Sequence, residues 1–305
     1  FRLRDLADDQ LLDEKAAIAG LRLLSRVGGT AKSPIDRYTF PSQETDVRVD
    51  DDLHLPDGTD FGRVDAIDLV GCTIDVKKRG ALSEVHPEAV FAHSLVDTEL
   101  LAAALLRLGD DVVKHGVNAG TKWLAARELL LIRPPRLRSG RFEQHEGESA
   151  LALAIRVAPD LDRTVLAIQG PPGAGKTYAG ARMICELVRK GKRVGVTAAS
   201  HRVIRNLLDA ATKAAGEMGF AIQCVHKVNE RSNTPSTFIK ETTSNEAVIA
   251  QVWDRRAEVA AGTPWLWARP EFEGAVDVLF VDEAGQVALA NIVAAGTCAR
   301  NIVLL

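Results

Sequence analysis

Several kinds of residue are scarce in this 305-residue sequence, and each absence narrows the functions that it can have. The cysteines are few and form no C-x-x-C pair, which argues against a disulfide framework or a zinc site and favours a reducing cytoplasm. The seven histidines show neither H-x-x-x-H nor H-E-x-x-H spacing, so we expect no metal site built on them. The four cysteines are Cys72, Cys185, Cys224 and Cys298.

The sequence also lacks a long apolar run and an excess of positive charge. No apolar stretch reaches the roughly 18 residues of a membrane span, and no signal peptide is present, so we expect no membrane partner. The net charge of -3 and pI of about 6.2 give no global sign of nucleic-acid binding, although a local basic groove is enough for it. The chain begins at Phe1 without Met and stops at Leu305 inside an apolar run, which predicts a piece of a longer protein.

The first 140 residues mix helical and strand-like patterns. Residues 1–30 read as one helix, with apolar residues near one face and Gly28-Gly29 at its end. Residues 37–78 show short alternating runs around the Pro56-Asp57-Gly58 turn, which predicts a small antiparallel sheet or barrel of four to six strands. Residues 92–132 return to helical spacing. A basic loop follows, which either contacts a nucleic-acid backbone or, as we prefer, forms a solvated linker.

From about residue 145 the pattern alternates between strands and helices. This order predicts an α/β domain with a mostly parallel sheet covered by helices on both faces. We expect strands over 165–169, 193–197, 221–225, 278–282 and 301–305. The helices should end near residues 189 and 218, and residues 245–260 should form a third.

A complete phosphate-binding loop, GPPGAGKT, occupies residues 170–177 and lies directly after an apolar strand and before a helix. Its glycines let backbone N–H groups face phosphates, and the helix N-terminus adds partial positive charge. Lys176 would reach the β- and γ-phosphates and the Thr177 hydroxyl would ligate Mg²⁺. The expected nucleotide contacts are Gly170, Pro171, Pro172, Gly173, Ala174, Gly175, Lys176, Thr177 and Tyr178.

An acidic pair, Asp282-Glu283, follows four apolar residues at the expected carboxyl end of a strand, where open α/β sheets bind ligands. Asp282 would hold Mg²⁺, and Glu283 would orient and deprotonate the attacking water. Two adjacent carboxylates are costly unless a cation lies between them, which favours a metal–nucleotide site. The expected cofactors are therefore ATP and Mg²⁺.

Four segments together carry a resemblance to a known family. The loop GPPGAGKT, VGVTAASHRVIRNLL (194–208), GTPWLWAR (262–269) and DEAGQ (282–286) resemble consecutive motifs of superfamily 1 helicases. DEAGQ is similar to the group that moves 5′ to 3′, and the chain looks most like the helicase part of bacterial RecB-like nuclease–helicase fusions. The resemblance is strong over 165–305 and softer over 1–140.

The resemblance implies a RecA-like P-loop NTPase domain preceded by a small β-barrel on a helical stalk. It divides the chain into a stalk helix (1–33), the barrel (34–90), stalk helices with a basic linker (91–143) and a truncated RecA-like domain (144–305). It also implies an ATP-dependent helicase that translocates on single-stranded DNA or RNA. Gln286 joins Lys176, Asp282 and Glu283 as catalytic residues, and the expected nucleic-acid contacts are Thr197, Ala198, Ser200, His201 and Thr263.

Parts of the family pattern are missing from the sequence. The second RecA-like domain with its arginine finger lies beyond Leu305, and a nuclease domain would precede Phe1, so the fragment should hydrolyse ATP poorly. Neither Gln144 nor Glu148 fits the adenine-reading position. Trp265 and Trp267 either stack on bases or, as aromatics more often do, anchor the core. Alternative interpretations are another P-loop enzyme, such as an AAA+ ATPase, or a nucleotide-binding module without helicase activity.

Overall fold

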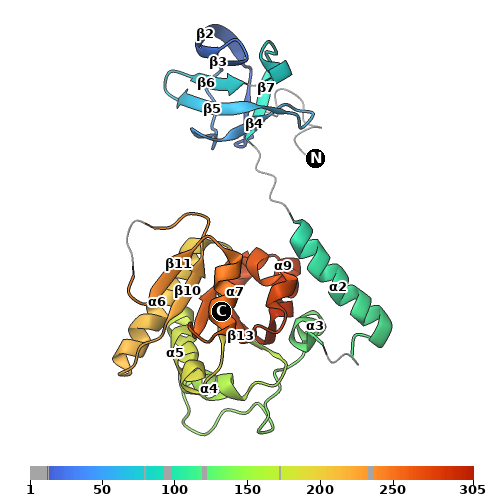
Figure 1. Cartoon of the computed structure of the whole chain (residues 1–305), viewed down its shortest axis with the longest axis vertical. Helices are drawn as coiled ribbons and strands as arrows, with labels where there is room; N and C mark the ends of the chain where they lie inside the picture. Colours follow the sequence, from blue (N-terminus) through green and yellow to red (C-terminus); the bar gives the residue numbers. More distant parts are fainter. Residues whose placement is uncertain are drawn as a thin grey trace. The chain divides into compact units, whose positions relative to one another are not determined.

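The computed structural model describes residue 12 and residues 14–78, 80–92, 98–118, 122–171, 173–232 and 236–305. The chain divides into two compact units, Phe1–Val96 and Asp97–Leu305. Each unit is described by itself (Figure 1). None of the helices in the described ranges combines the length and the apolar character needed to cross a lipid bilayer.

The N-terminal unit is a curled antiparallel sheet. Its strand order in the described residues is β1-β7-β4-β5-β6-β3-β2, and every neighbouring pair is antiparallel. The first two strands are consecutive in the chain but lie at opposite ends of this order, so the sheet must curl for the chain to pass between them. The strands are β1 (Ala17–Ala19), β2 (Arg22–Thr30), β3 (Ser33–Thr39), β4 (Asp52–His54), β5 (Asp60–Asp68), β6 (Thr73–Lys78) and β7 (Ala89–Ala92).

The helix predicted over residues 1–30 is wrong wherever this segment is described, because residues 17–19 and 22–30 are strands. Residues 1–11 and 13 lie outside the described part. The pairing of β2 with β3 overrides the helical spacing of the leucines and alanines. Gly29, interpreted as a helix end, instead has φ 82° at the hairpin, where an added Cβ would lie 2.2 Å from the Ser33 carbonyl oxygen.

The core of this sheet contains a buried ion pair. Lys78 and Asp36 are 0% and 1% exposed, and Nζ lies 2.6 Å from Asp36 Oδ2. The ammonium also donates to the Tyr38 hydroxyl and to the Val85 carbonyl, so this buried charge is neutralised and hydrogen-bonded. The pair packs among apolar side chains that alternate along the strands, including those of Ile18, Leu53, Phe61, Val64, Ile74 and Val76.

The C-terminal unit is the predicted α/β domain with a parallel sheet. Its strand order in the described residues is β11-β10-β12-β9-β13-β14-β8, with every neighbouring pair parallel. The strands are β8 (Val165–Ala167), β9 (Val194–Thr197), β10 (Cys224–Lys227), β11 (Ile239–Thr242), β12 (Val259–Ala261), β13 (Val276–Val281) and β14 (Ala299–Leu304).

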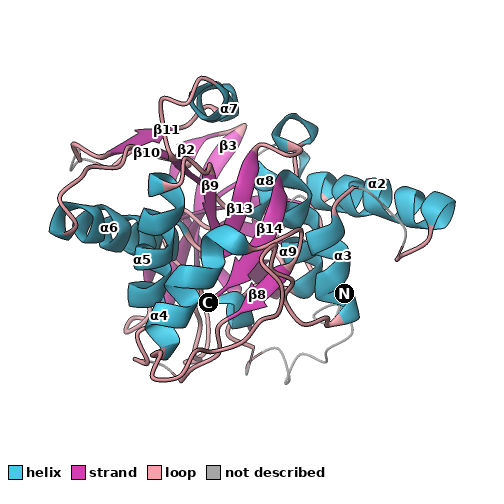
Figure 2. Ribbon diagram, turned by 90° about the horizontal axis from the view of Figure 1, so that it is seen from below, coloured by secondary structure: helices cyan, strands magenta, loops and turns pink. Residues whose placement is uncertain are grey.

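Helices cover both faces of this sheet (Figure 2). One face packs against α4 (Ala150–Val157), α5 (Lys176–Arg189) and α6 (His201–Glu217). The other face packs against α3 (Leu124–Leu131), α7 (Asn245–Trp253), α8 (Pro264–Trp267) and α9 (Leu289–Ala295), and α2 (Glu99–His115) packs on α9. Strands buried on both faces are largely apolar, as in β9 and β13.

The sequence analysis did not predict two strands of this sheet. Strand β11 was assigned no structure, and β12 falls partly within the helix predicted over 245–260. That helix ends at Trp253, where Arg255 takes a left-handed φ of 53° and turns the chain into β12. Because β12 has only three residues, all buried, it lacks the periodicity that separates a strand from a helix.

Trp267 anchors the face of the sheet covered by α8. Its side chain is 0% exposed, and Nε1 donates to the carbonyl oxygens of Val196 and Gly262, both at 3.1 Å. The interpretation of Trp267 as a core anchor is therefore confirmed. Trp265 is partly buried and packs against α2 and α9.

We expect Trp267→Ala to lower the free energy of unfolding by about 3–5 kcal/mol, because it leaves a large cavity and removes the buried hydrogen bonds that Nε1 donates. The matched control is Trp253→Ala, since the Trp253 side chain is 53% exposed. Urea denaturation of both variants measures the difference, and equal losses of stability would contradict the assignment.

Candidate functional site

The loop after β8 forms an open cradle at the start of α5. Gly173 and Gly175 have φ angles of 79° and 81°, a conformation in which L side chains are strained. Glycines in this conformation before the N-terminus of a helix are typical of loops whose N–H groups bind anions. Pro172 lies outside the described residues. The left-handed glycines and the helix start are thus the features of a phosphate-binding loop that the described residues show.

Lys176 is the first residue of α5 and folds back across this loop. Its ammonium donates to the carbonyl oxygens of Gly170 at 2.7 Å and Pro171 at 3.3 Å. Thr177 follows in the first turn and is partly buried. Tyr178 is 52% exposed, and the Arg182 guanidinium stacks 3.5 Å from the centre of its ring. The cation and the hydroxyl are thus placed together beside the cradle.

Asp282 follows β13 directly and is 3% exposed. Its backbone N–H donates to the Thr197 carbonyl at 2.9 Å, and its Oδ1 accepts from the Glu283 N–H at 3.0 Å. Burial raises the pKa of this carboxyl, the neighbouring Glu283 charge raises it further, and the Lys176 charge lowers it. Asp282 is therefore a buried carboxylate that a positive charge would stabilise.

Glu283 turns away from the sheet into solvent. It is exposed and has φ 49°, a left-handed conformation that is uncommon for a residue other than glycine. The strain is maintained by neighbouring hydrogen bonds, from the Gln286 N–H to the Glu283 carbonyl and from the Ala284 N–H to the Leu305 carbonyl. Strain of this kind clusters at functional sites. Gln286 is exposed at the end of the same turn.

A single cleft of about 640 Å³ brings the loop and the acidic segment together. Gly170 and Lys176 line it from one side, and Glu283 and Gln286 line it from the other. Strand β14 lies between β8 and β13, so the two segments start roughly 10 Å apart at two strand spacings. They converge at the carboxyl edge of the sheet, where α/β sheets bind ligands.

The residues at this edge fit a magnesium-bound phosphate chain. The amide-lined cradle and Lys176 suit the phosphates, and the Thr177 hydroxyl and the Asp282 carboxylate are oxygen ligands of the kind that Mg²⁺ takes. Within the described residues, no cluster of three or more His, Cys, Asp or Glu side chains could hold a metal ion. The ion would therefore depend on phosphate oxygens as well as on Thr177 and Asp282.

The predicted nucleic-acid residues lie at the ends of β9 and β12. Thr197 and Ala198 are completely buried, so their side chains do not reach solvent. Ser200 is exposed and caps α6 through a 3.3 Å hydrogen bond from the Val203 N–H to its Oγ. Thr263 is partly buried and precedes α8. Of these residues, Ser200 is the most accessible to a ligand.

His201 has a partner that the sequence analysis missed. Its Nδ1 lies 3.3 Å from Nε2 of His226, which is on β10 and 1% exposed. The two histidines are 25 residues apart, and no motif connects them. Only the occurrence of an imidazole directly after the buried Cys224 and Val225 could have drawn attention to His226.

The residues considered for adenine binding lie in the loop before α4. Glu148 accepts from Arg156 Nε at 2.6 Å, and Gln144 donates to the Glu148 carbonyl. In the basic segment, Arg136 pairs with the buried Glu128 and Arg138 donates to the Leu161 carbonyl. These contacts tie the segment to the domain, so Arg136 and Arg138 have structural partners.

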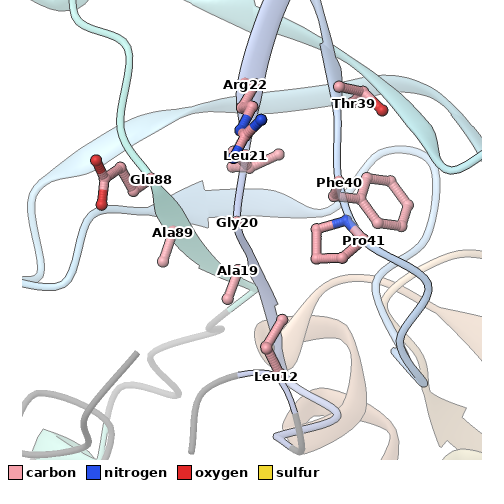
Figure 3. A pocket seen from close by; sticks show the side chains of 10 residues that line it. All are labelled: Leu12, Ala19, Gly20, Leu21, Arg22, Thr39, Phe40, Pro41, Glu88 and Ala89. Carbon is pink, nitrogen blue, oxygen red and sulfur yellow. The ribbon is translucent and has the colours of Figure 1, made fainter. Parts of the chain in front are cut away.

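A larger cavity, of about 730 Å³, lies in the N-terminal unit (Figure 3). The lining is mainly apolar and includes Leu21, Phe40 and Pro41, with Arg22 and Glu88 as the charged residues. Figure 3 shows Arg22 on β2, Glu88 just before β7 and Thr39 on β3 as the polar side chains of this lining, and the Thr39 hydroxyl already donates to the Cys72 carbonyl. We therefore place the chemistry at the smaller cleft beside Lys176.

Comparison with known proteins supports this placement. Residues 152–302 match the model of a family described as an AAA domain. The matched segment includes the phosphate loop, the acidic pair and all seven strands of the parallel sheet except the end of β14. No curated protein matches the chain. The C-terminal unit thus carries a P-loop NTPase domain, and its fold implies nucleotide binding.

We expect Asp282→Asn to raise the Tm of the nucleotide-free protein, because it removes a buried negative charge, and to abolish the further rise caused by Mg²⁺ with nucleotide. The raised pKa of Asp282 means that the folded state disfavours the ionised carboxylate. The stability gained by the variant therefore depends on pH. The Tm advantage of the variant should therefore be largest near pH 7 and shrink as the pH falls through that pKa.

Thermal unfolding between pH 4 and pH 8 measures both effects. The control is Asp277→Asn, which lies at the opposite end of β13. If the Tm of Asp282→Asn at pH 7 without ligand is lower than that of the wild type, the ionised Asp282 carboxylate does not destabilise the folded state and the prediction is wrong.

Proposed function

We propose that the P-loop NTPase domain of residues 152–302 hydrolyses ATP in response to single-stranded DNA or RNA and belongs to a superfamily 1 helicase. One contact carries this proposal. The Asp282 N–H that holds the magnesium carboxylate in place donates to the Thr197 carbonyl, three residues before the exposed helix end at Ser200. The end of β13 that carries Asp282 and the end of β9 that leads to Ser200 are therefore hydrogen-bonded to each other.

Residues in and beside the cleft have positions that support distinct roles. Lys176 would bind the terminal phosphates and Glu283 would orient a water and accept its proton, while Thr177 and Asp282, beside the cleft, would hold Mg²⁺. The metal, when bound, neutralises the charge of the phosphate oxygens. Gln286, exposed on the same turn, is placed to contact the phosphate or a neighbouring domain.

The N-terminus of α6 supports the binding of a nucleic-acid phosphate. The helix has 17 residues, and its N-terminal amides carry a partial positive charge beside the exposed Ser200. Thr263 precedes α8 at the end of β12, which is two strands from β13 at the same edge of the sheet. A single-stranded nucleic acid that ran across this edge of the sheet would contact Ser200 and Thr263 close to the nucleotide cleft.

A different P-loop ATPase, including an AAA+ type, is the main alternative, since the matched family is described only as an AAA domain. That alternative explains the cleft equally well, but it leaves the Ser200 and Thr263 segments without a role. A nucleotide-gated module without turnover is the second alternative. Complete enzymes of the resembled family have a second RecA-like domain, which supplies an arginine finger worth roughly 10³–10⁵ in rate in related systems.

We expect the ATPase activity of the full-length protein to rise severalfold on addition of single-stranded DNA or RNA. Lys176→Ala should abolish turnover by removing the phosphate-binding charge, and Glu283→Gln should abolish turnover while retaining nucleotide binding. Steady-state ATPase assays and binding of a fluorescent nucleotide measure the two properties. Equal turnover with and without nucleic acid would rule out the helicase interpretation.

Ser200→Asp tests the strand-binding end separately from helix stability. Aspartate is a good helix N-cap, so α6 should remain intact, but its charge repels phosphate. We expect affinity for single strands to fall about tenfold, which corresponds to about 1.4 kcal/mol. The control is Ser244→Asp, since Ser244 caps α7 through an equivalent hydrogen bond from the Ala247 N–H. Equal affinities of the two variants would favour the AAA+ alternative.

A further inference from the structure

Leu305 connects the two sides of the nucleotide cleft, which it also lines. Its backbone belongs to the acidic side, because its N–H donates to the Val281 carbonyl and its carbonyl accepts from the Ala284 N–H, both at 3.0 Å. Ala284 directly follows Glu283 in the chain. These two hydrogen bonds therefore hold the turn with the acidic pair against the residue that follows β14.

The side chain of Leu305 belongs to the apolar core on the other side of the cleft, under α5 and α6, and is only 4% exposed. It meets α5 at Gly180. A Cβ added to this glycine would lie 2.5 Å from Leu305 Cδ1 and 3.6 Å from Leu207 Cδ1. Because two apolar carbons normally approach only to about 3.5–4.0 Å, α5 can pack this closely on Leu305 only without a side chain at position 180.

Gly180 lies one turn after Lys176 on the same face of α5. Lys176 and Thr177 begin this helix, and the phosphate loop leads directly into it. A displacement of α5 at Gly180 would therefore carry the phosphate-binding groups with it. It would change their distance from Asp282 and Glu283 across the cleft.

The helix itself gives no reason for a glycine at position 180. Gly180 lies inside α5, and glycine within a helix is less favourable than alanine. Gly216 in α6 offers a comparison, because a Cβ added there would meet no atom within 4 Å. The contact with Leu305 is thus a feature of position 180 that a helical glycine does not share in general.

We infer that Gly180 and Leu305 are positioning residues for nucleotide hydrolysis, because their contact fixes the distance between α5 and the acidic turn. They act through Lys176 on one side of the cleft and Glu283 on the other. The inference rests on the proposed function for the reaction, whereas the contact follows from the packing of the domain. A methyl group at position 180 would displace α5 or Leu305 by about 1 Å, and misplacing reacting groups by this much can lower a rate about a hundredfold.

Gly180→Ala should therefore lower kcat for ATP at least about tenfold, since the water oriented by Glu283 is no longer aligned with the phosphate bound by Lys176. Nucleotide affinity without Mg²⁺ should stay unchanged, because the phosphate loop and Lys176 move together with α5. The gain in affinity that Mg²⁺ provides should fall severalfold, because the ion needs Thr177 from one side of the cleft and Asp282 from the other.

A second substitution tests whether the contact itself is responsible. Leu305→Val removes the two Cδ atoms that the added methyl group would meet. The double variant Gly180→Ala/Leu305→Val should therefore recover most of the lost kcat and of the Mg²⁺-dependent affinity. A loss caused by general destabilisation would instead grow in the double variant. The matched control is Gly216→Ala, which adds the same methyl group to a helix where it meets no neighbour.

Steady-state ATPase assays with single-stranded DNA, and binding of a fluorescent nucleotide with and without Mg²⁺, measure these properties in the full-length protein. Circular dichroism and the Tm verify that each variant folds. If Gly180→Ala behaves like Gly216→Ala in both assays, the Leu305 side chain moves aside without consequence, and the inference is overturned while the proposed function stands. A double variant that recovers neither property would also overturn it.

Failure of the proposed function has a different signature, because it appears in the wild type. A wild type that binds Mg²⁺ and nucleotide but shows no turnover that responds to nucleic acid would overturn the proposed function. The Mg²⁺-dependent affinities of Gly180→Ala and of the double variant would then still decide whether the contact positions the two sides of the cleft.

Discussion

A buried carboxylate is the constraint on which the C-terminal unit depends. Asp282 is held at the end of β13 with 3% of its surface exposed, in a position where burial raises its pKa. An ionised group in such a place needs a positive charge nearby. The fold provides one by placing Lys176 at the start of α5, close enough to lower the pKa of the carboxyl against the effect of burial.

The order of the strands sets the distance between the phosphate loop and the acidic pair. Because β14 lies between β8 and β13, the phosphate loop and the acidic pair are separated by about two strand spacings instead of being adjacent. The separation leaves the cleft that Gly170, Lys176, Glu283 and Gln286 line. Apolar cores on both faces of the sheet hold the strands in this order, so the width of the cleft is a property of the whole domain.

Local chemistry made this part of the molecule predictable from sequence. The phosphate loop needs glycines at left-handed positions, and the acidic pair follows an apolar strand, so both could be placed without knowledge of tertiary contacts. The parallel sheet followed from the alternation of strands and helices. Two features could not be predicted from the sequence. The distance across the cleft arises from the strand order, and the left-handed backbone of Glu283 arises from hydrogen bonds to distant residues such as Leu305.

The wrong or missing sequence predictions also arise from contacts between residues that are distant in the sequence. Residues 22–30 have apolar spacing that suits a helix, yet β3 offers them a ladder of backbone hydrogen bonds, and the Gly28-Gly29 pair serves that hairpin. Strand β12 is too short for any period to be visible. His226 was missed because its importance lies in a contact with His201, which only the pairing of β10 and the orientation of α6 bring about.

The nucleotide cleft lies at the edge of the sheet where the parallel strands end, so the charges around it are set by this edge and not by the net charge of -3 of the whole chain. Parallel strands place helix N-termini on the same side, so the amide dipoles of α5 and α6 point toward it together. Lys176 adds a full positive charge there, Asp282 and Glu283 add negative charges, and the hydrogen bond from Asp282 to Thr197 joins the ends of β13 and β9. A local field of this kind depends on where the charges lie, and the negative charges elsewhere on the chain are largely screened beyond about 8–10 Å at physiological salt.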